Sequence, residues 1–190
     1  MILPGILPFV RELIDRCLTE GDIAVDATAG NGLDTLYLAK KVGDSGKVYS
    51  FDIQLAAIEK TKARLKEHHL AHRVSLIQNG HEQAVTCIPK EELTLLKAAV
   101  FNLGYLPSGD KSITTKGETT IQAVSQLLEI MQSGALIILV IYHGHEEGKK
   151  EKQKVETFSA QLDQREVQVL RYEFMNQVNN PPFIIALEKK

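Results

Sequence analysis

The sequence predicts a doubly wound α/β fold, and two observations carry this prediction. Predicted strands and helices alternate along the 190 residues, which is the pattern of a mostly parallel sheet with helices on both faces. In addition, only a short loop separates the last two predicted strands. Such strands must be antiparallel, because a parallel pair needs a long crossover. We therefore expect a Rossmann-like, seven-stranded, mostly parallel sheet that ends in an antiparallel hairpin.

The elements of the first half follow from apolar spacing and from turn residues. Apolar residues three and four apart predict helices, whereas short apolar runs between turn signals predict strands. The turn GDSG, residues 43–46, separates a helix from the next strand. The predicted helices cover residues 6–18, 33–42 and 55–69, and the predicted strands cover residues 22–26, 47–52 and 73–78.

The second half continues the alternation and then breaks it. The most apolar strand follows Gly134, and a strongly charged helix comes after it. No further helix separates the last two strands, which flank a turn region at residues 176–180. The predicted helices cover residues 118–131 and 146–162, and the predicted strands cover residues 98–102, 135–142, 167–174 and 183–188.

The composition is that of one globular, cytoplasmic domain spanning residues 1–190. Hydrophobic residues make up 44% and charged residues 24% of the chain. The longest apolar run is about a third of a membrane span, and no secretory signal is evident. The two cysteines are too few for a disulfide framework or a cysteine-only zinc site. A net charge of -2 argues against nonspecific coating of nucleic acid, but a local basic face could still hold a structured RNA.

A glycine-rich turn, DATAGNG, follows the first predicted strand. Gly30 and Gly32 allow a tight turn close to a ligand. The turn lacks the third glycine of a dinucleotide fingerprint and the lysine of a phosphate loop. Asp26 would repel a pyrophosphate but suits a cationic ligand such as a sulfonium amino acid. Asp52, at the end of the second strand, is placed to accept hydrogen bonds from ribose hydroxyls. Together these features favour S-adenosylmethionine.

The segment FNLGYLPSGDKS follows the fourth predicted strand and nearly spells a phosphate loop. The segment departs from the phosphate-loop motif by one residue, because Asp110 separates the last glycine from Lys111. An anion is unfavourable at a phosphate site, and Pro107 removes an amide donor that the loop would need. We interpret residues 108–115 as a mobile loop on the substrate side.

The start of the same segment fits a different chemistry. Asn102-Leu-Gly-Tyr105 keeps the polar first and aromatic fourth positions of the Asn-Pro-Pro-Tyr motif found in enzymes that methylate amino groups. The polar side chain can accept hydrogen bonds from an amine, and the aromatic ring can stack on an exposed base. Gly104 allows close backbone approach. We therefore expect residues 102–105 to form an amine-facing wall.

Two further motifs lie at ends of predicted strands. NGHE, residues 79–82, follows the third strand, where it would border an adenine. YHGH, residues 142–145, follows the fifth strand and could supply a substrate contact or a general base. No third and fourth ligands accompany the two histidines of YHGH, so no metal is predicted.

A family resemblance rests on these motifs. DATAGNG, with Thr28 where glycine is more usual, resembles the first motif of class I S-adenosylmethionine-dependent methyltransferases, which share the predicted sheet. The set DATAGNGLDT, FDIQ, NGHE, FNLGYLPSGDKSITT and YHGHEEG resembles the YtqB-like rRNA methylase family, also known as MnmM-type tRNA 5-aminomethyl-2-thiouridine methyltransferases. The resemblance covers essentially the whole chain. It implies N-methylation of the 5-aminomethyl group of (2-thio)uridine at tRNA wobble position 34.

The predicted site residues form three groups. Residues expected to act on or align the amine are Asn102, Tyr105, Tyr142, His143 and His145. Residues expected to bind the cofactor are Asp26, Ala27, Thr28, Gly30, Asn31, Gly32, Asp34, Thr35, Asp52, Ile53, Gln54, Gly80, His81, Glu82 and Asn102. Residues expected to bind the substrate are Leu103, Gly104, Tyr105 and Lys111.

Several alternatives stay open at the level of the sequence. The substrate could be an rRNA site or a small-molecule amine instead of the tRNA anticodon loop, and the chain could be a noncatalytic S-adenosylmethionine-binding module. Lysines near residues 111–116 and 149–154 could meet RNA phosphates or form a solvated helix face. We also expect a homodimer, because a compact chain gains substrate-contacting surface by dimerising.

Overall fold

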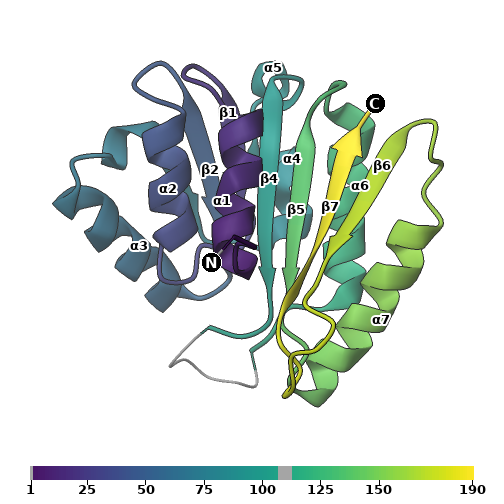
Figure 1. Cartoon of the computed structure of the whole chain (residues 1–190). Helices are drawn as coiled ribbons and strands as arrows, with labels where there is room; N and C mark the ends of the chain where they lie inside the picture. The colour runs from purple at the N-terminus through teal and green to yellow at the C-terminus, as the bar shows by residue number, and fades with distance from the viewer. Residues whose placement is uncertain (1, 107–112) are drawn as a thin grey trace.

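A computed structural model describes residues 2–106 and 113–190 of the chain (Figure 1). Its strands form one seven-stranded sheet in the order β3-β2-β1-β4-β5-β7-β6. The neighbours from β3 to β5 are parallel, whereas β7 is antiparallel to both β5 and β6. The predicted doubly wound sheet with a C-terminal antiparallel hairpin is confirmed.

The observed elements lie close to the predicted ones. The strands are β1 (Ile23–Asp26), β2 (Lys47–Phe51), β3 (Val74–Ile77), β4 (Leu96–Leu103), β5 (Leu136–Ile141), β6 (Val167–Tyr172) and β7 (Phe183–Lys189). The long helices are α1 (Ile6–Cys17), α2 (Leu33–Lys41), α3 (Leu55–Glu67), α6 (Gly117–Ile130) and α7 (Glu146–Ala160). The short helices are η1 (Ala71–Arg73), η2 (His81–Gln83), α4 (Ala84–Cys87) and α5 (Lys90–Leu93).

The helices cover the two faces of the sheet, as Figure 1 shows for α1 in front of the strands and α6 behind them. Residues from α1, α2 and α3 pack on one face, and residues from α4, α5, α6 and α7 pack on the other. Along β5, Ile137 and Leu139 face the second layer, whereas Ile138 and Val140 face the first. This alternation explains why the strand reads as a continuous apolar run, because both of its faces are buried.

The topology gathers the loops after the parallel strands at one edge of the sheet, because parallel strands end on the same side. The loops after β1, β2, β3, β4 and β5 all leave from this carboxyl edge, which is the lower edge in Figure 1. Open α/β sheets bind ligands at this edge, where the strand order reverses. Here the reversal falls between β1 and β4.

The main differences from the predicted elements lie between β3 and β4. The sequence pattern predicts no helix there, whereas the structure has the short helices η2, α4 and α5. Four residues or fewer per helix are too short to show helical periodicity. Among the described residues, no helix is long and apolar enough to cross a membrane.

Candidate active site

The turn after β1 has the conformation that its glycines predict. Gly30 and Gly32 have φ values of +54° and +74°, a region that favours glycine. A Cβ atom at Gly32 would lie 2.9 Å from the Cα of Thr61 on α3. Gly32 therefore lets α3 approach the turn, while Gly30 keeps its backbone open to a cavity.

The Asp26 carboxyl is completely buried beneath this turn. It accepts hydrogen bonds from the Thr35 hydroxyl at 2.5 Å and from the Thr28 backbone N–H at 3.1 Å. Burial, together with the charge of Asp34, raises the pKa of Asp26 to about 7. The carboxyl thus ties the turn to α2, a different place from the ligand-facing one that the sequence suggested.

Asp52 is held so that its carboxylate meets the turn. One oxygen accepts from the Gly30 N–H at 2.9 Å, and the other accepts from the Gln54 N–H, also at 2.9 Å. These two backbone donors fix the plane of the carboxylate, and each oxygen keeps a further lone pair. The group can therefore accept hydrogen bonds from two neighbouring hydroxyls, as predicted for a ribose.

Asn102, near the end of β4, joins the same constellation. Its backbone N–H donates to the Thr28 hydroxyl at 2.7 Å. Thr28, which stands where glycine is more usual, therefore links β4 to the turn. Its side-chain nitrogen donates to Asp34 at 2.7 Å. Because a carboxylate only accepts, this bond fixes the amide orientation and leaves the Asn102 Oδ1 as an acceptor.

The backbone beyond Asn102 is anchored from α7. Gly104 donates from its N–H to the Thr115 hydroxyl at 2.8 Å, and Thr115 returns a bond to the Gly104 carbonyl. The Thr115 hydroxyl in turn donates to Glu151 at 2.5 Å, and Thr120 donates to the same carboxylate at 2.8 Å. Glu151 is buried, and burial raises the pKa of its carboxyl. A hydrogen-bond chain therefore runs from Gly104 through Thr115 to a buried acid.

The YHGH motif brings its ring side chains to the end of β5. The Tyr105 and His145 rings meet edge to face at 5.2 Å, and the Thr114 hydroxyl lies 3.3 Å from His145 Nε2. The His143 ring is buried against Phe183. Burial and the nearby charge of Lys152 lower the pKa of His143, so its ring is neutral near pH 7.

His81, from the NGHE motif, is buried between the first turn and the sheet. Its Nδ1 donates to the Ala27 carbonyl at 3.2 Å, and its ring meets Phe101 edge to face. Burial lowers the pKa of His81 and favours the neutral ring. In that form Nε2 is an acceptor, and it has no partner among the described residues.

Two adjoining cavities lie at the carboxyl edge. The first, of about 300 Å³, extends from the turn toward β2 and β3. The second, of about 670 Å³, extends toward α1 and β5. Predicted residues lining the first are Ala27, Thr28, Gly30, Asp52, Ile53, Gln54, Gly80, His81, Glu82, Asn102, Gly104 and Tyr105. Predicted residues lining the second are Thr28, Gly30, Asn31, Asp34, Asn102, Gly104, Tyr105, Tyr142, His143 and His145.

The remaining predicted residues lie elsewhere. Asp26, Gly32, Thr35 and Leu103 line neither cavity and support the walls from behind. Lys111 and most of the predicted substrate-side loop lie outside the described residues. Thr115, the last residue of that loop, lines the first cavity, although it was not a predicted site residue. Residues with no predicted role that line one cavity or the other include Thr119, Leu7 and Arg11.

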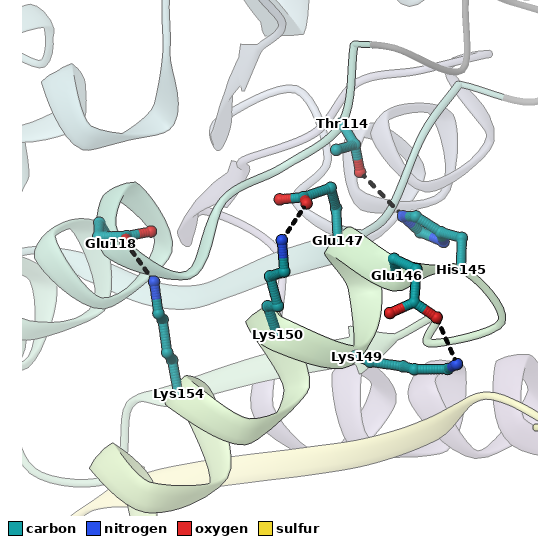
Figure 2. Close-up of polar contacts among 8 residues, drawn as sticks. All are labelled: Thr114, Glu118, His145, Glu146, Glu147, Lys149, Lys150 and Lys154. Carbon is teal, nitrogen blue, oxygen red and sulfur yellow. Dashed lines mark hydrogen bonds and ion pairs between the residues drawn. The ribbon is translucent and has the colours of Figure 1, made fainter.

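The charged start of α7 is largely neutralised by its own carboxylates. Figure 2 shows Lys149 paired with Glu146 and Lys150 paired with Glu147, each at 2.7 Å. Lys154 pairs with Glu118 of α6 in the same view. These pairs favour the solvated-face interpretation of the lysines over a dense phosphate-binding patch. In the described parts of the chain, no group of three His, Cys, Asp or Glu side chains is arranged to hold a metal ion.

The first cavity fits S-adenosylmethionine by the chemistry of its lining. Asp52 presents paired acceptors for a ribose, and Gly30 leaves the backbone accessible beside it. Asn102 stands where the two cavities join, so a methyl group carried by the cofactor would meet a second ligand there. This site on a Rossmann-like sheet defines the class as S-adenosylmethionine-dependent methyltransferases.

Comparison with known proteins agrees with this class. The chain belongs to the family described as "Putative rRNA methylase", whose model matches residues 48–188. A structure of a "putative rRNA-methylase" from Clostridium thermocellum is 44% identical, with full coverage of both chains and a TM-score of 0.96. A Streptococcus mutans methyltransferase solved with S-adenosylhomocysteine is 34% identical over 99% of both chains, with a TM-score of 0.89.

A curated relative from Arabidopsis thaliana has a more specific name. It is the chloroplastic tRNA (mnm(5)s(2)U34)-methyltransferase, which is 34% identical over 184 residues. The match covers 93% of this chain but 66% of the plant protein. The predicted cofactor, S-adenosylmethionine, is confirmed for the family through the complex with S-adenosylhomocysteine.

Proposed function

We propose that this methyltransferase transfers the methyl group to the primary amine of 5-aminomethyl-(2-thio)uridine at tRNA wobble position 34. The observation that carries the proposal is the orientation of Asn102. Its Nδ2 is committed to Asp34, so its Oδ1 offers an acceptor to an amine at the junction of the two cavities. The name of the plant relative supports the tRNA position.

The residues present suit an in-line displacement by an amine. S-adenosylmethionine supplies an activated methyl group, so the protein mainly has to align the two reactants. Such alignment contributes about 7–11 kcal/mol in favourable intramolecular reactions. The Asn102 Oδ1 would hold one N–H of the amine and thereby direct the nitrogen lone pair toward the methyl group. The base itself would lie against Tyr105 and Tyr142, each 37% exposed at the second cavity.

An amine that enters protonated must lose a proton before attack. Asp34 attracts the ammonium form to the second cavity, and the ring of His145 at that cavity can accept a proton. The ring of His143 is neutral, but its Nε2 atom is buried. General-base help of this kind is typically worth about 10²–10⁴-fold in rate. An rRNA amine remains a second candidate substrate, because the family description names rRNA.

The decisive experiment is mass spectrometry of RNA nucleosides after incubation with methyl-labelled S-adenosylmethionine. The substrate RNA should come from cells that lack this enzyme, so that the target amine is unmethylated. We expect label in 5-methylaminomethyl-2-thiouridine from tRNA. Label confined to rRNA would favour the second candidate, and label in no tRNA nucleoside would contradict the proposal.

A further inference from the structure

The outer rim of the second cavity is formed by α1, an element with no predicted site residue. Leu7 and Arg11, one helical turn apart, line the cavity from this side. Leu33, at the start of α2, lines the same cavity and is 53% exposed, and Leu7 itself is 46% exposed. The rim thus combines two exposed aliphatic side chains with one guanidinium group.

Among the described residues, Arg11 has no anionic partner at this rim. Its guanidinium lies over the Tyr37 ring, 5.1 Å from the ring centroid. The carboxylate one turn further along α1, Asp15, is already occupied by Lys41 and the Tyr37 hydroxyl, each at 2.8 Å. Within residues 2–106 and 113–190, no carboxylate is paired with Arg11. Stacking therefore orients the guanidinium while its N–H donors stay available.

We propose that Arg11 binds a backbone phosphate of the RNA strand next to the nucleotide that enters the second cavity. This inference rests on the proposed function, since it takes RNA as the substrate. A guanidinium presents a fork of donors that matches phosphate oxygens, and an Arg stacked on a ring retains those donors. Three lysines of α7 are paired with carboxylates (Figure 2). Arg11, which has no such pair within the part of the chain that the structure describes, is therefore the better candidate for a phosphate contact.

The test uses RNA stem-loops that carry the target nucleotide, with methylation measured under saturating cofactor. The variants are Arg11→Ala and, as a matched control, Arg16→Ala. Arg16 is an exposed residue of the same helix that lines neither cavity. Each change removes one positive charge from α1. A second substrate carries neutral methylphosphonate linkages on both sides of the target nucleotide.

We expect Arg11→Ala to raise the KM for the stem-loop about tenfold, to leave kcat nearly unchanged and to lower the salt slope of binding by about 1. Arg16→Ala should behave like the unsubstituted protein. For the unsubstituted protein, the neutral linkages should raise the KM for the stem-loop by a similar factor. For Arg11→Ala they should raise the KM scarcely further, because the substitution and the neutral linkages remove the same contact.

Two results would overturn the phosphate contact. The first is an equal KM for the stem-loop in the Arg11→Ala and Arg16→Ala variants. The second is that the effects of Arg11→Ala and of the neutral linkages on this KM are fully additive in free energy. Failure of the proposed function looks different. In that case, the unsubstituted protein itself methylates no stem-loop, and both proposals fall together before any variant is compared.

Discussion

At the scale of single residues, Asp52 and Asn102 hold different places at the two cavities. Asp52 is fixed by two backbone donors beside the first cavity, whereas Asn102 is fixed by Asp34 and Thr28 where the cavities meet. We therefore expect Asp52 to act mainly on the cofactor and Asn102 mainly on the substrate amine. Their substitution should separate cofactor binding from turnover.

Asp52→Ala should weaken S-adenosylhomocysteine binding by about 10- to 100-fold, since hydrogen bonds to a charged group contribute about 1.5–3 kcal/mol each. Asn102→Ala should lower single-turnover rates by at least about tenfold with cofactor affinity nearly unchanged, because its proposed contact is with the reacting amine. Titration calorimetry and rapid-quench kinetics measure the two quantities. Unchanged turnover of Asn102→Ala, with the cofactor still bound, would refute its role.

Asp26 provides a second residue-scale prediction, which concerns pH. An unfolded aspartate ionises near 3.8, but in the folded chain the pKa is raised to about 7. The folded state therefore holds the proton more tightly, and this group lowers stability as pH rises from about 4 to 7. Asp26→Asn removes that effect, and its amide still accepts from Thr28 and can donate to Thr35.

Urea unfolding at pH 5 and at pH 7.5 tests this sign. The advantage of Asp26→Asn over the unsubstituted protein should be greater at pH 7.5 than at pH 5. Asp15→Asn is the control, because Lys41 and Tyr37 lower the pKa of Asp15. That carboxyl is ionised at both pH values, so the stability difference between Asp15→Asn and the unsubstituted protein should not change between them. An advantage that is equal at both pH values would contradict the shifted titration of Asp26.

At the scale of elements, α7 matters more than its charged sequence suggests. Its buried Glu151 accepts a hydrogen bond from Thr115, in the segment that leads into α6, and the Thr115 hydroxyl in turn accepts one from the Gly104 N–H. Thr115 also lines the first cavity. The helix therefore controls the geometry of a wall to which it contributes no lining residue.

Glu151→Gln should weaken S-adenosylhomocysteine binding about 3- to 10-fold and lower stability by about 1–3 kcal/mol, because the amide nitrogen cannot accept a hydrogen bond from a threonine hydroxyl. Thr115→Val should give a similar loss, and Thr115→Ser, which keeps the hydroxyl, should restore binding. Calorimetry and urea unfolding provide the measurements. Glu147→Gln, exposed on the same helix, should change little, and an equal effect there would remove the special role of Glu151.

The sequence predicted the long elements and most cavity residues, but it could not reveal Glu151. Apolar periodicity identifies the strands because both faces of the sheet are buried, and motif spelling identifies Asn102 because its chemistry is local. Glu151 lies in a run of charges that is typical of a solvated helix face. Its burial depends on how α7 packs against α6, which is a property of the tertiary structure. Arg11 could not be predicted either. It lies on α1, before the first motif, and only the tertiary structure brings that helix to the second cavity.

At the scale of the whole molecule, cofactor binding should stabilise the fold as a unit. The first cavity draws its walls from the loops after β1, β2, β3 and β4, so one ligand bridges much of the carboxyl edge. A ligand present at a concentration 100 times its dissociation constant raises the free energy of unfolding by about 2.7 kcal/mol. For a domain of this size the Tm should rise by about 5–10 °C.

Scanning calorimetry with S-adenosylhomocysteine measures this shift. Asp52→Ala should show a much smaller shift at the same ligand concentration. Absence of any shift for the unsubstituted protein at saturating ligand would contradict the assignment of the cavity. The homodimer stays a prediction, and light scattering in solution will test it.

The position of β7 has a consequence for synthesis on the ribosome. β7 comes last among the strands in the sequence but lies inside the sheet, between β5 and β6. Until Phe183–Lys189 has emerged, the growing chain presents β5 with an open, apolar edge that invites association with other nascent chains. Chaperone protection should therefore matter most between emergence of β5 and emergence of β7, and a stop codon before residue 183 should give aggregation rather than a smaller folded protein.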